Sequence, residues 1–492
     1  MQSSKRSAFR GAQFTVAMRW SDRLIGLVST MILARVLLPQ DFGLVAMATI
    51  AVVLVDVVLD LGVAAALVQN SSASDADFDT AWTLRLCQVA LVAAIAAAGA
   101  PLVASFYNDP RLADVMRVVA VSTLVGGFEN IGVVRLQKDM EFGREFAFFA
   151  SKRLIGTVIT IGLALTLRSY WALVIGTLAS RLVGVALSYL MHPYRPRFSL
   201  SRWSGIWGFS QWNILSSIAS YLGGRADQFV IGRRESAKVL GWYSVGSEVA
   251  FLPSTELLAP LGRVMFPAFV RVREDVNELL RIFLLSLAVQ ALVGIPAGIG
   301  IALVAEQVVA LMLGAKWIGA VPIVQTLGLA GVALALSSSP QYLLLALGRI
   351  RTLAWFNAVL CILLVLGLAS LELTVVQIAK LRLAVVVLGL LIINWLAISA
   401  MSELNGKRVV REVWRPLLAA CAMWTFVEAT DIFLLGAPIV VVLAIKVLAG
   451  ALVYLTAVAL LWVFAGRPQG GEAYVLEKTG VARLWTRARA RV

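Results

Sequence analysis

Charged residues, histidine and cysteine are all scarce in this chain. Of its 492 residues, 14% are charged, one is histidine and three are cysteine. A soluble protein carries about 25% charged residues, so this composition argues against a soluble protein. Cys87, Cys361 and Cys421 lie far apart in apolar segments, which predicts small buried side chains and excludes a disulfide framework or a zinc motif. His192 stands beside Pro193, where we expect a helix to end. We therefore expect no metal and no cofactor.

Apolar residues, by contrast, fill long segments along the whole sequence. They make up 60% of the chain, and the mean hydropathy is +0.87. The segments are about 20 residues or longer and lack strict alternation, which favours transmembrane helices over barrel strands. In a chain this apolar, the net charge of +15 indicates membrane topology rather than nucleic-acid binding. The predicted fold class is an all-α membrane protein of about 14 transmembrane helices, with no nucleic acid as partner.

A stretch near the N-terminus recurs in the second half of the chain. Residues 229–233 (FVIGR) align with residues 31–35 (MILAR), and Gly241 aligns with Gly43 at the same spacing. A repeat of this length indicates a duplicated helical bundle. Six predicted spans lie in each copy, and an even number returns the chain to the same side, so we expect two parallel lobes around a central cleft. The predicted parts are an N-terminal six-helix lobe (1–195), a C-terminal six-helix lobe (204–403), two additional transmembrane helices (404–465) and a basic cytoplasmic tail (466–492).

Lysine and arginine gather on alternate predicted loops. One set of loops holds, for example, Arg135, Lys138 and Arg144, whereas the opposite set is sparser. The positive-inside rule therefore places both termini in the cytoplasm. The arginine-rich end of the tail is open to two interpretations, a topology signal or an interfacial helix on anionic lipid.

Charged residues inside the predicted spans are the candidate functional residues, because a charge in the bilayer centre costs about 3 kcal/mol or more. A guanidinium matches phosphate with paired hydrogen bonds and stays charged in a cavity. We therefore predict a cationic, anion-binding cleft formed by Arg19, Arg23, Arg85, Arg225 and Arg263. The alternative is that these arginines pair with carboxylates that are structural partners or ion- or proton-coupling groups: Asp22, Asp56, Asp60, Glu129, Asp227 and Glu248. Arg153 and Arg181 can instead reach the membrane interface.

Residues 34–46 (ARVLLPQDFGLVA) resemble the opening hairpin of the polysaccharide transporter family. These are the Wzx-type O-antigen and exopolysaccharide flippases of the multidrug/oligosaccharidyl-lipid/polysaccharide exporter superfamily. Residues 311–329 are similar to the family's stretch that enters the tenth helix. The resemblance implies two lobes of six helices, two further helices and no catalytic residues, so the protein is not expected to be an enzyme.

The implied function is translocation of undecaprenyl-diphosphate-linked oligosaccharide repeat units across the bacterial inner membrane by alternating access, for exopolysaccharide, capsule or O-antigen synthesis. The head group would pass through the cleft. The implied partners are this lipid-linked oligosaccharide, membrane lipids, a polysaccharide polymerase and a chain-length regulator.

Three other functions compete with this one. A drug or cation antiporter of the same superfamily would use Asp56, Asp60 or Glu129 as a proton or sodium site, but the arginine content favours an anionic substrate. A membrane polymerase or glycosyltransferase is disfavoured because no nucleotide-sugar domain or large outer loop is evident. A flippase for a peptidoglycan precursor is disfavoured by the opening motif.

Overall fold

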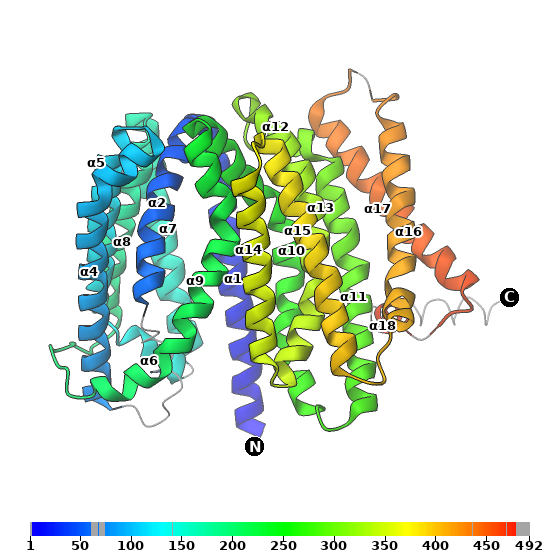
Figure 1. Cartoon of the computed structure of the whole chain (residues 1–492), viewed down its shortest axis with the longest axis horizontal. Helices are drawn as coiled ribbons and strands as arrows, with labels where there is room; N and C mark the ends of the chain where they lie inside the picture. Colours follow the sequence, from blue (N-terminus) through cyan, green and yellow to red (C-terminus); the bar gives the residue numbers. More distant parts are fainter. Residues whose placement is uncertain are drawn as a thin grey trace. The chain divides into compact units, whose positions relative to one another are not determined.

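The computed structural model describes residues 2–60, 67, 74–139, 141–434, 436–468 and 470–478, and the basic end of the tail lies outside these ranges. Within them, the side chains of residues 2–16, 19, 203–216, 257–260, 263 and 476–478 also lie outside the description. The elements, drawn in Figure 1, are α1 (Gln2–Val36), α2 (Pro39–Leu59), α4 (Asp75–Tyr107), α5 (Arg111–Gly127), α6 (Val133–Lys138), α7 (Phe142–Leu167), α8 (Trp171–Met191), α9 (Trp203–Arg234), α10 (Ala237–Arg271), α11 (Val276–Leu303), α12 (Ala305–Met312), the 3-10 helix η1 (Ala315–Ala320), α13 (Val321–Ala346), α14 (Ile350–Ser370), α15 (Val375–Ala400), α16 (Gly406–Thr430), α17 (Ile439–Phe464) and α18 (Gly471–Lys478).

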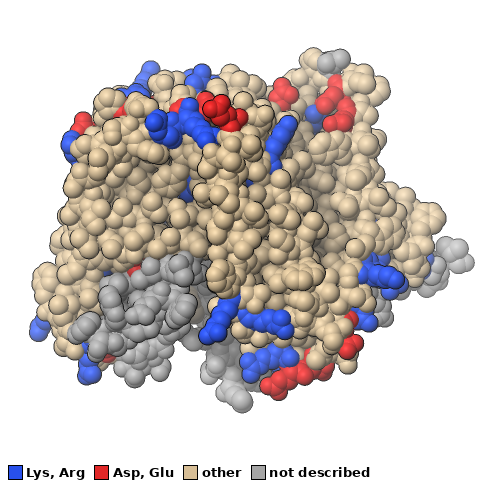
Figure 2. Space-filling view, in the orientation of Figure 1, with Lys and Arg blue, Asp and Glu red and all other residues tan. Residues whose placement is uncertain are grey.

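The described part of the chain is built from helices, and no strand occurs in it, which confirms the predicted all-α membrane class. Within the same ranges, 9 helical segments are long and apolar enough to cross a membrane. The count of about 14 spans stays a prediction, because α1, α9, α10 and α16 are long but carry more charge and α5 has 17 residues. On the face drawn in Figure 2, charged side chains gather near the ends of the helices, and the stretches between are uncharged.

The chain divides into two compact units, unit 1 (Met1–Ser244) and unit 2 (Val245–Val492). The division falls inside α10, whereas the sequence places the lobe boundary in the connector before α9. In unit 1, α9 packs against α2 and α4, and the Tyr221 hydroxyl donates a hydrogen bond to the Ile50 carbonyl over 2.8 Å. The helix that follows the connector therefore packs with the N-terminal helices, and the predicted limits of the lobes stay a prediction.

The starts of α2 and α10 approach each other so closely that each requires glycine. A Cβ on Gly43 would lie 1.7 Å from the Ala237 carbonyl oxygen, and a Cβ on Gly241 would lie 1.9 Å from the Pro39 carbonyl oxygen. The two contacts are reciprocal, as they are between copies related by a twofold axis. Gly43 and Gly241 are also aligned in the sequence repeat, so this is the contact that a duplicated bundle would form.

The connector between α8 and α9 is held against the start of α4 and against α6. The Arg135 guanidinium lies over the rings of Phe78 and Tyr194, 4.3 and 4.4 Å from their centres, and pairs with Asp75. Burial and the hydrogen bond to Asp79 raise the pKa of the Tyr194 phenol above its usual value. These contacts fix the point where the chain enters α9.

In unit 2, α11 is the central helix and packs against α13 and α16, while α17 packs on α16. The short helix α18 is joined to α16 by a buried ion pair. Arg415 Nε and Nη2 lie 2.6 and 3.1 Å from the two Glu472 carboxylate oxygens, and these side chains are only 3% and 5% exposed. A bidentate pair of this kind fixes the position of α18 against the bundle.

The prediction for the cysteines was wrong. Cys87 and Cys421 are exposed and Cys361 is partly exposed, all on long apolar helices. An apolar helix in a membrane can turn a small apolar residue towards lipid as readily as towards the core. His192 follows the last residue of α8, as the sequence predicts.

Candidate functional site

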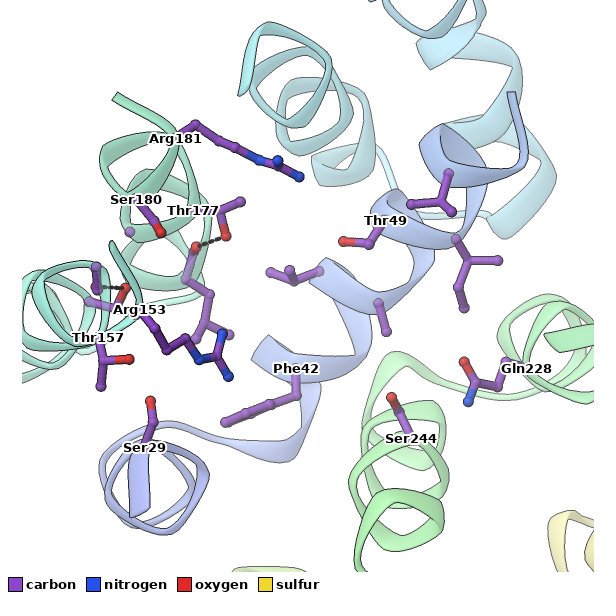
Figure 3. Close-up of a pocket in the computed structure, with 18 of the residues that line it drawn as sticks. Ser29, Phe42, Thr49, Arg153, Thr157, Thr177, Ser180, Arg181, Gln228 and Ser244 are labelled. Atoms are coloured by element: carbon purple, nitrogen blue, oxygen red, sulfur yellow. Dashed lines mark hydrogen bonds between the residues drawn. The ribbon is translucent and has the colours of Figure 1, made fainter. Parts of the chain in front are cut away.

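Unit 1 contains a partly open cavity of about 610 Å³. Its walls come from α1, α2, α7, α8, α9 and the start of α10. Figure 3 shows Arg153 and Arg181 projecting towards this space from α7 and α8, with Thr49 on α2 and Gln228 on α9 facing them. The cavity is therefore bounded by helices that are far apart in the sequence.

Four cationic side chains line the cavity: Lys152, Arg153, Arg181 and Arg225. None of the described residues that line it is acidic. Cations gathered in a cavity raise the local potential and attract anions. The walls of this cavity are therefore suited to an anionic group.

The carboxylates that compensate two of these cations lie outside the lining. Lys152 pairs with Glu129, and Arg153 Nε lies 3.3 Å from Asp22 Oδ1, in a pair whose members are 48% and 63% exposed. A pair this exposed contributes only about 0–1 kcal/mol. Asp22 therefore does little to hold the Arg153 guanidinium away from a ligand.

The other two cations are less compensated. Arg225 Nη1 donates to Gln228 Oε1 over 2.9 Å, which orients the guanidinium without neutralising it. Arg181 makes no ion pair within the described part of the chain, and its side chain passes beside Gly126, where a Cβ would lie 3.3 Å from it. Both guanidinium groups keep hydrogen-bond donors available.

Small residues between α7 and α8 make room for these cations. A Cβ on Gly184 would lie 2.5 Å from Lys152 Cε, and one on Gly156 would lie 2.4 Å from Ser180 Oγ. Small residues let transmembrane helices approach closely. The close approach of α7 and α8 brings Arg153 and Arg181 to one wall.

Hydroxyl groups fill much of the remaining polar surface: Ser29, Thr49, Thr157, Thr160, Thr177, Ser180, Tyr221 and Ser244. The hydroxyls of Thr160 and Thr177 each donate to a carbonyl in their own helix over 2.8 Å. Their oxygen lone pairs are then oriented as acceptors for a ligand hydroxyl. The cavity thus offers cations for an anion and acceptors for a polyol.

Of the five arginines predicted for the cleft, Arg225 lines this cavity. The side chains of Arg19 and Arg263 lie outside the described residues. Arg23 is partly buried on α1 and does not line the cavity. Arg85 Nη1 lies 3.4 Å from Asp56 Oδ1, also away from the lining. The structure therefore does not bring the predicted set together in this space.

The predicted acidic partners are mostly engaged. Asp56 also accepts from Gln88 Nε2 over 3.1 Å. Asp227 is 2% exposed and accepts hydrogen bonds from the Tyr243 hydroxyl and the Gln228 backbone N–H. Asp60 follows the last residue of α2, and Glu248 is exposed on α10.

Sequence reasoning did not assign Lys152, Arg153 and Arg181 to the cavity. The available signal was their spacing from small residues: Gly156 follows Arg153 by three positions, and Gly184 follows Arg181 by three. Three positions along a helix return to the same face, so each arginine shares a face with a glycine.

The fold and the cavity together define a polytopic membrane transporter. A family model described as "Polysaccharide biosynthesis protein" matches residues 32–322, more than half of the chain, and the chain belongs to this family. The predicted resemblance to the Wzx-type polysaccharide transporters is thereby confirmed.

Individual relatives agree with this assignment. The "Lipopolysaccharide biosynthesis protein WzxC" of Escherichia coli (strain K12) is 27% identical over 341 residues, which cover 68% of each chain. The "Teichuronic acid biosynthesis protein TuaB" of Bacillus subtilis (strain 168) is 26% identical over 469 residues, covering 92% of this chain and 96% of the relative. Among solved structures, "Lipid II flippase MurJ, inward closed conformation" matches with a TM-score of 0.74 at 14% identity, over 92% of this chain and 100% of MurJ, and this likeness concerns the fold.

Proposed function

We propose that the protein is a flippase that moves undecaprenyl-diphosphate-linked oligosaccharide repeat units across the bacterial inner membrane. The diphosphate binds in the unit 1 cavity, and both termini face the cytoplasm. The observation that carries the proposal is the set of four cations around a space whose described lining residues include no acid. The substrate class also fits the printed names of relatives in lipopolysaccharide and teichuronic acid biosynthesis.

The chemistry of a sugar diphosphate matches this lining. Its phosphate oxygens accept paired hydrogen bonds from guanidinium groups, and each such charged hydrogen bond contributes about 1.5–3 kcal/mol. Arg181 and Arg225 supply donors that no carboxylate of the described chain occupies. The threonine and serine hydroxyls around them are matched to the hydroxyls of the first sugars. The polyprenyl chain stays in the lipid, because apolar surface gains nothing from a polar cavity.

Alternating access delivers the head group to the other side of the membrane. The arginines predicted from the sequence but placed outside this cavity or outside the description, Arg19, Arg23, Arg85 and Arg263, remain part of the proposed path. Asp22, Asp56, Asp60, Glu129, Asp227 and Glu248 act as structural partners or as the coupling groups of the cycle. A polysaccharide polymerase and a chain-length regulator take over the product.

A drug or cation antiporter is the second candidate, and the charge of the cavity argues against it. A cationic substrate would meet Arg181 and Arg225, which pair with no carboxylate of the described chain, and the cavity lining offers it no described carboxylate. Such a substrate would therefore be repelled from this space.

The proposal is tested with purified protein in liposomes that contain a polyprenyl-diphosphate-linked oligosaccharide. Movement is measured as sugar that becomes accessible to an external lectin. We expect movement by the wild type, loss of about two orders of magnitude or more in Arg181→Ala/Arg225→Ala, and normal movement in the control Arg111→Ala/Arg117→Ala. The control arginines lie in unit 1, are themselves about half exposed (49% and 51%), and pair with Asp109 and Asp114 away from the cavity lining. Equal movement in both double variants, or faster transport of a cationic dye than of the lipid, would refute the proposal.

A further inference from the structure

Unit 2 contains another partly open cavity, of about 380 Å³. It lies at the end of the unit where α11 finishes and where α13, α15 and α17 begin, close to α12 in Figure 1. Unlike the unit 1 cavity, it carries both signs of charge in its lining: Lys380, Lys446, Glu306, Glu428 and Asp431. A ligand for this cavity therefore has to present both a negative and a positive group.

Two deeply buried polar side chains of the lining have unused hydrogen-bonding capacity. Lys446 is 5% exposed, and its Nζ lies 2.6 Å from Asp431 Oδ1. An ammonium group has three N–H donors, so this pair leaves donors for a further acceptor. Gln307 is 8% exposed, and its Oε1 accepts no hydrogen bond from the described residues. A buried acceptor without a donor costs about 1–3 kcal/mol, which a ligand with an N–H group would recover.

The remaining charges of the cavity define the ligand further. Lys380, Glu306 and Glu428 form no ion pair within the described ranges of the chain, although they line the same space. A simple anion would be repelled by the two glutamates, and a simple cation would leave Lys380 and the remaining N–H donors of Lys446 without an acceptor. In the described residues, no group of three or more His, Cys, Asp or Glu side chains is placed to hold a metal ion. A zwitterion with separate anionic and N–H-bearing cationic groups satisfies the whole set.

The depth of the cavity points to a lipid as the source of this zwitterion. Lys380 is the sixth residue of α15 and Lys446 the eighth of α17, so at 1.5 Å per residue both lie about 8–10 Å from the start of a predicted span. This is the depth of the boundary between head groups and acyl chains. Beside Asp431, the exposed side chains of Ile432 and Phe433 (72% and 85%) offer an apolar surface for acyl chains.

We propose that this cavity binds the phosphoethanolamine head group of an aminophospholipid. The phosphate oxygens accept hydrogen bonds from Lys446 and Lys380. The primary ammonium donates to Glu306, Glu428 and Gln307 Oε1. A choline head group has no N–H to donate to Gln307, and a glycerol head group has no positive charge for the two glutamates. This binding concerns unit 2 and does not depend on which substrate the unit 1 cavity carries.

The test is lipid binding to the purified full-length protein in detergent, measured by native mass spectrometry with short-chain phosphatidylethanolamine, phosphatidylcholine and phosphatidylglycerol. We expect phosphatidylethanolamine to bind at least about 10-fold more tightly than either of the others. Lys380→Gln and Glu428→Gln should each weaken it by about 5–10-fold. Neither residue has an ion-pair partner in the described chain, so both variants should fold. Glu403→Gln, in the connection after α15, and Lys407→Gln, at the start of α16, do not line the cavity; they are the matched controls and should bind normally.

Equal binding of the three lipids, or normal binding by Lys380→Gln and Glu428→Gln, would overturn the proposal. Competition with soluble glycerophosphoethanolamine distinguishes a membrane lipid from a soluble ligand as the source of the head group. Competition at concentrations about 100-fold above the lipid supports a membrane lipid, because the acyl chains then contribute to binding. Competition by the soluble compound at equal concentration assigns the site to a soluble ligand and overturns the lipid.

Discussion

The cavities of unit 1 and unit 2 differ in where the counter-charges of their cationic side chains lie. In unit 1 all charged residues of the described lining are cations, and the carboxylates that pair with Lys152 and Arg153 lie outside the lining. In unit 2 the lining contains its own counter-charge, because Asp431 pairs with the buried Lys446 within the same wall. Removing one partner of a buried pair leaves an uncompensated charge, whereas removing an unpaired cation leaves none. Charge changes in unit 1 should therefore affect ligand binding, whereas breaking the buried Lys446–Asp431 pair in unit 2 should affect stability.

The largest expected effect is on transport through unit 1. Replacing both Arg153 and Arg181 with alanine removes two guanidinium groups from one wall, each worth about 1.5–3 kcal/mol towards a phosphate. We expect oligosaccharide flipping to fall by a factor of about 100 or more, while the melting temperature of the purified protein stays near that of the wild type. A variant that loses flipping together with its melting transition would show that these arginines hold the bundle together instead.

Much of the fold follows from the sequence, because the period and length of apolar segments identify membrane helices without knowledge of their packing. The repeat also led to Gly43 and Gly241, whose backbones meet at the starts of α2 and α10. The packing of α9 was not predictable, since its bond from Tyr221 to Ile50 joins residues far apart in sequence.

The candidate site was harder to predict than the fold. Arg225 was predicted and lines the unit 1 cavity, but Arg85 turns to Asp56 instead. Arg153 and Arg181 lie mid-helix, and sequence alone cannot decide whether such a side chain faces lipid, the interface or a neighbouring helix. That choice depends on the close approach of α7 and α8, which is a property of the packed bundle.

The second-largest expected effect is on the stability of unit 2, at the buried pair of Arg415 and Glu472. Arg415→Met should destabilise the protein by about 3–5 kcal/mol, because it leaves a 5%-exposed carboxylate unpaired. The double variant Arg415→Met/Glu472→Leu removes both charges and should recover most of this loss. Thermal unfolding measures the stability, and limited proteolysis of the tail reports whether α18 has detached. Equal destabilisation by the single and double variants would mean that packing, not charge, holds α18.

A smaller effect is expected at the wall of the unit 2 cavity. Asp431→Asn leaves Lys446 buried without its counter-ion, and because Asp431 is 53% exposed we expect a loss of about 1–3 kcal/mol in unfolding free energy. The control is Asp114→Asn in unit 1, which breaks a pair whose members are 51% and 66% exposed and should cost under about 1 kcal/mol. Similar losses in the two variants would remove the distinction between buried and surface charge on which the comparison rests.

The smallest effect comes from giving unit 1 the mixed charge of unit 2. Thr49 lies on α2 and faces the cavity from the side opposite Arg153 and Arg181 (Figure 3), and aspartate has nearly the size of threonine. Thr49→Asp should lower flipping by about 10-fold. A carboxylate on this wall repels the phosphates and offsets part of the attraction of the cations, which weakens phosphate binding by about 1–2 kcal/mol. Thr49→Asn has the same shape without the charge and should flip within about twofold of the wild type. The difference between the two variants should shrink as ionic strength rises, since salt screens charges in a water-accessible cavity. If Thr49→Asp and Thr49→Asn reduce flipping equally at all salt concentrations, the shape of the side chain at position 49 controls flipping, and its charge does not.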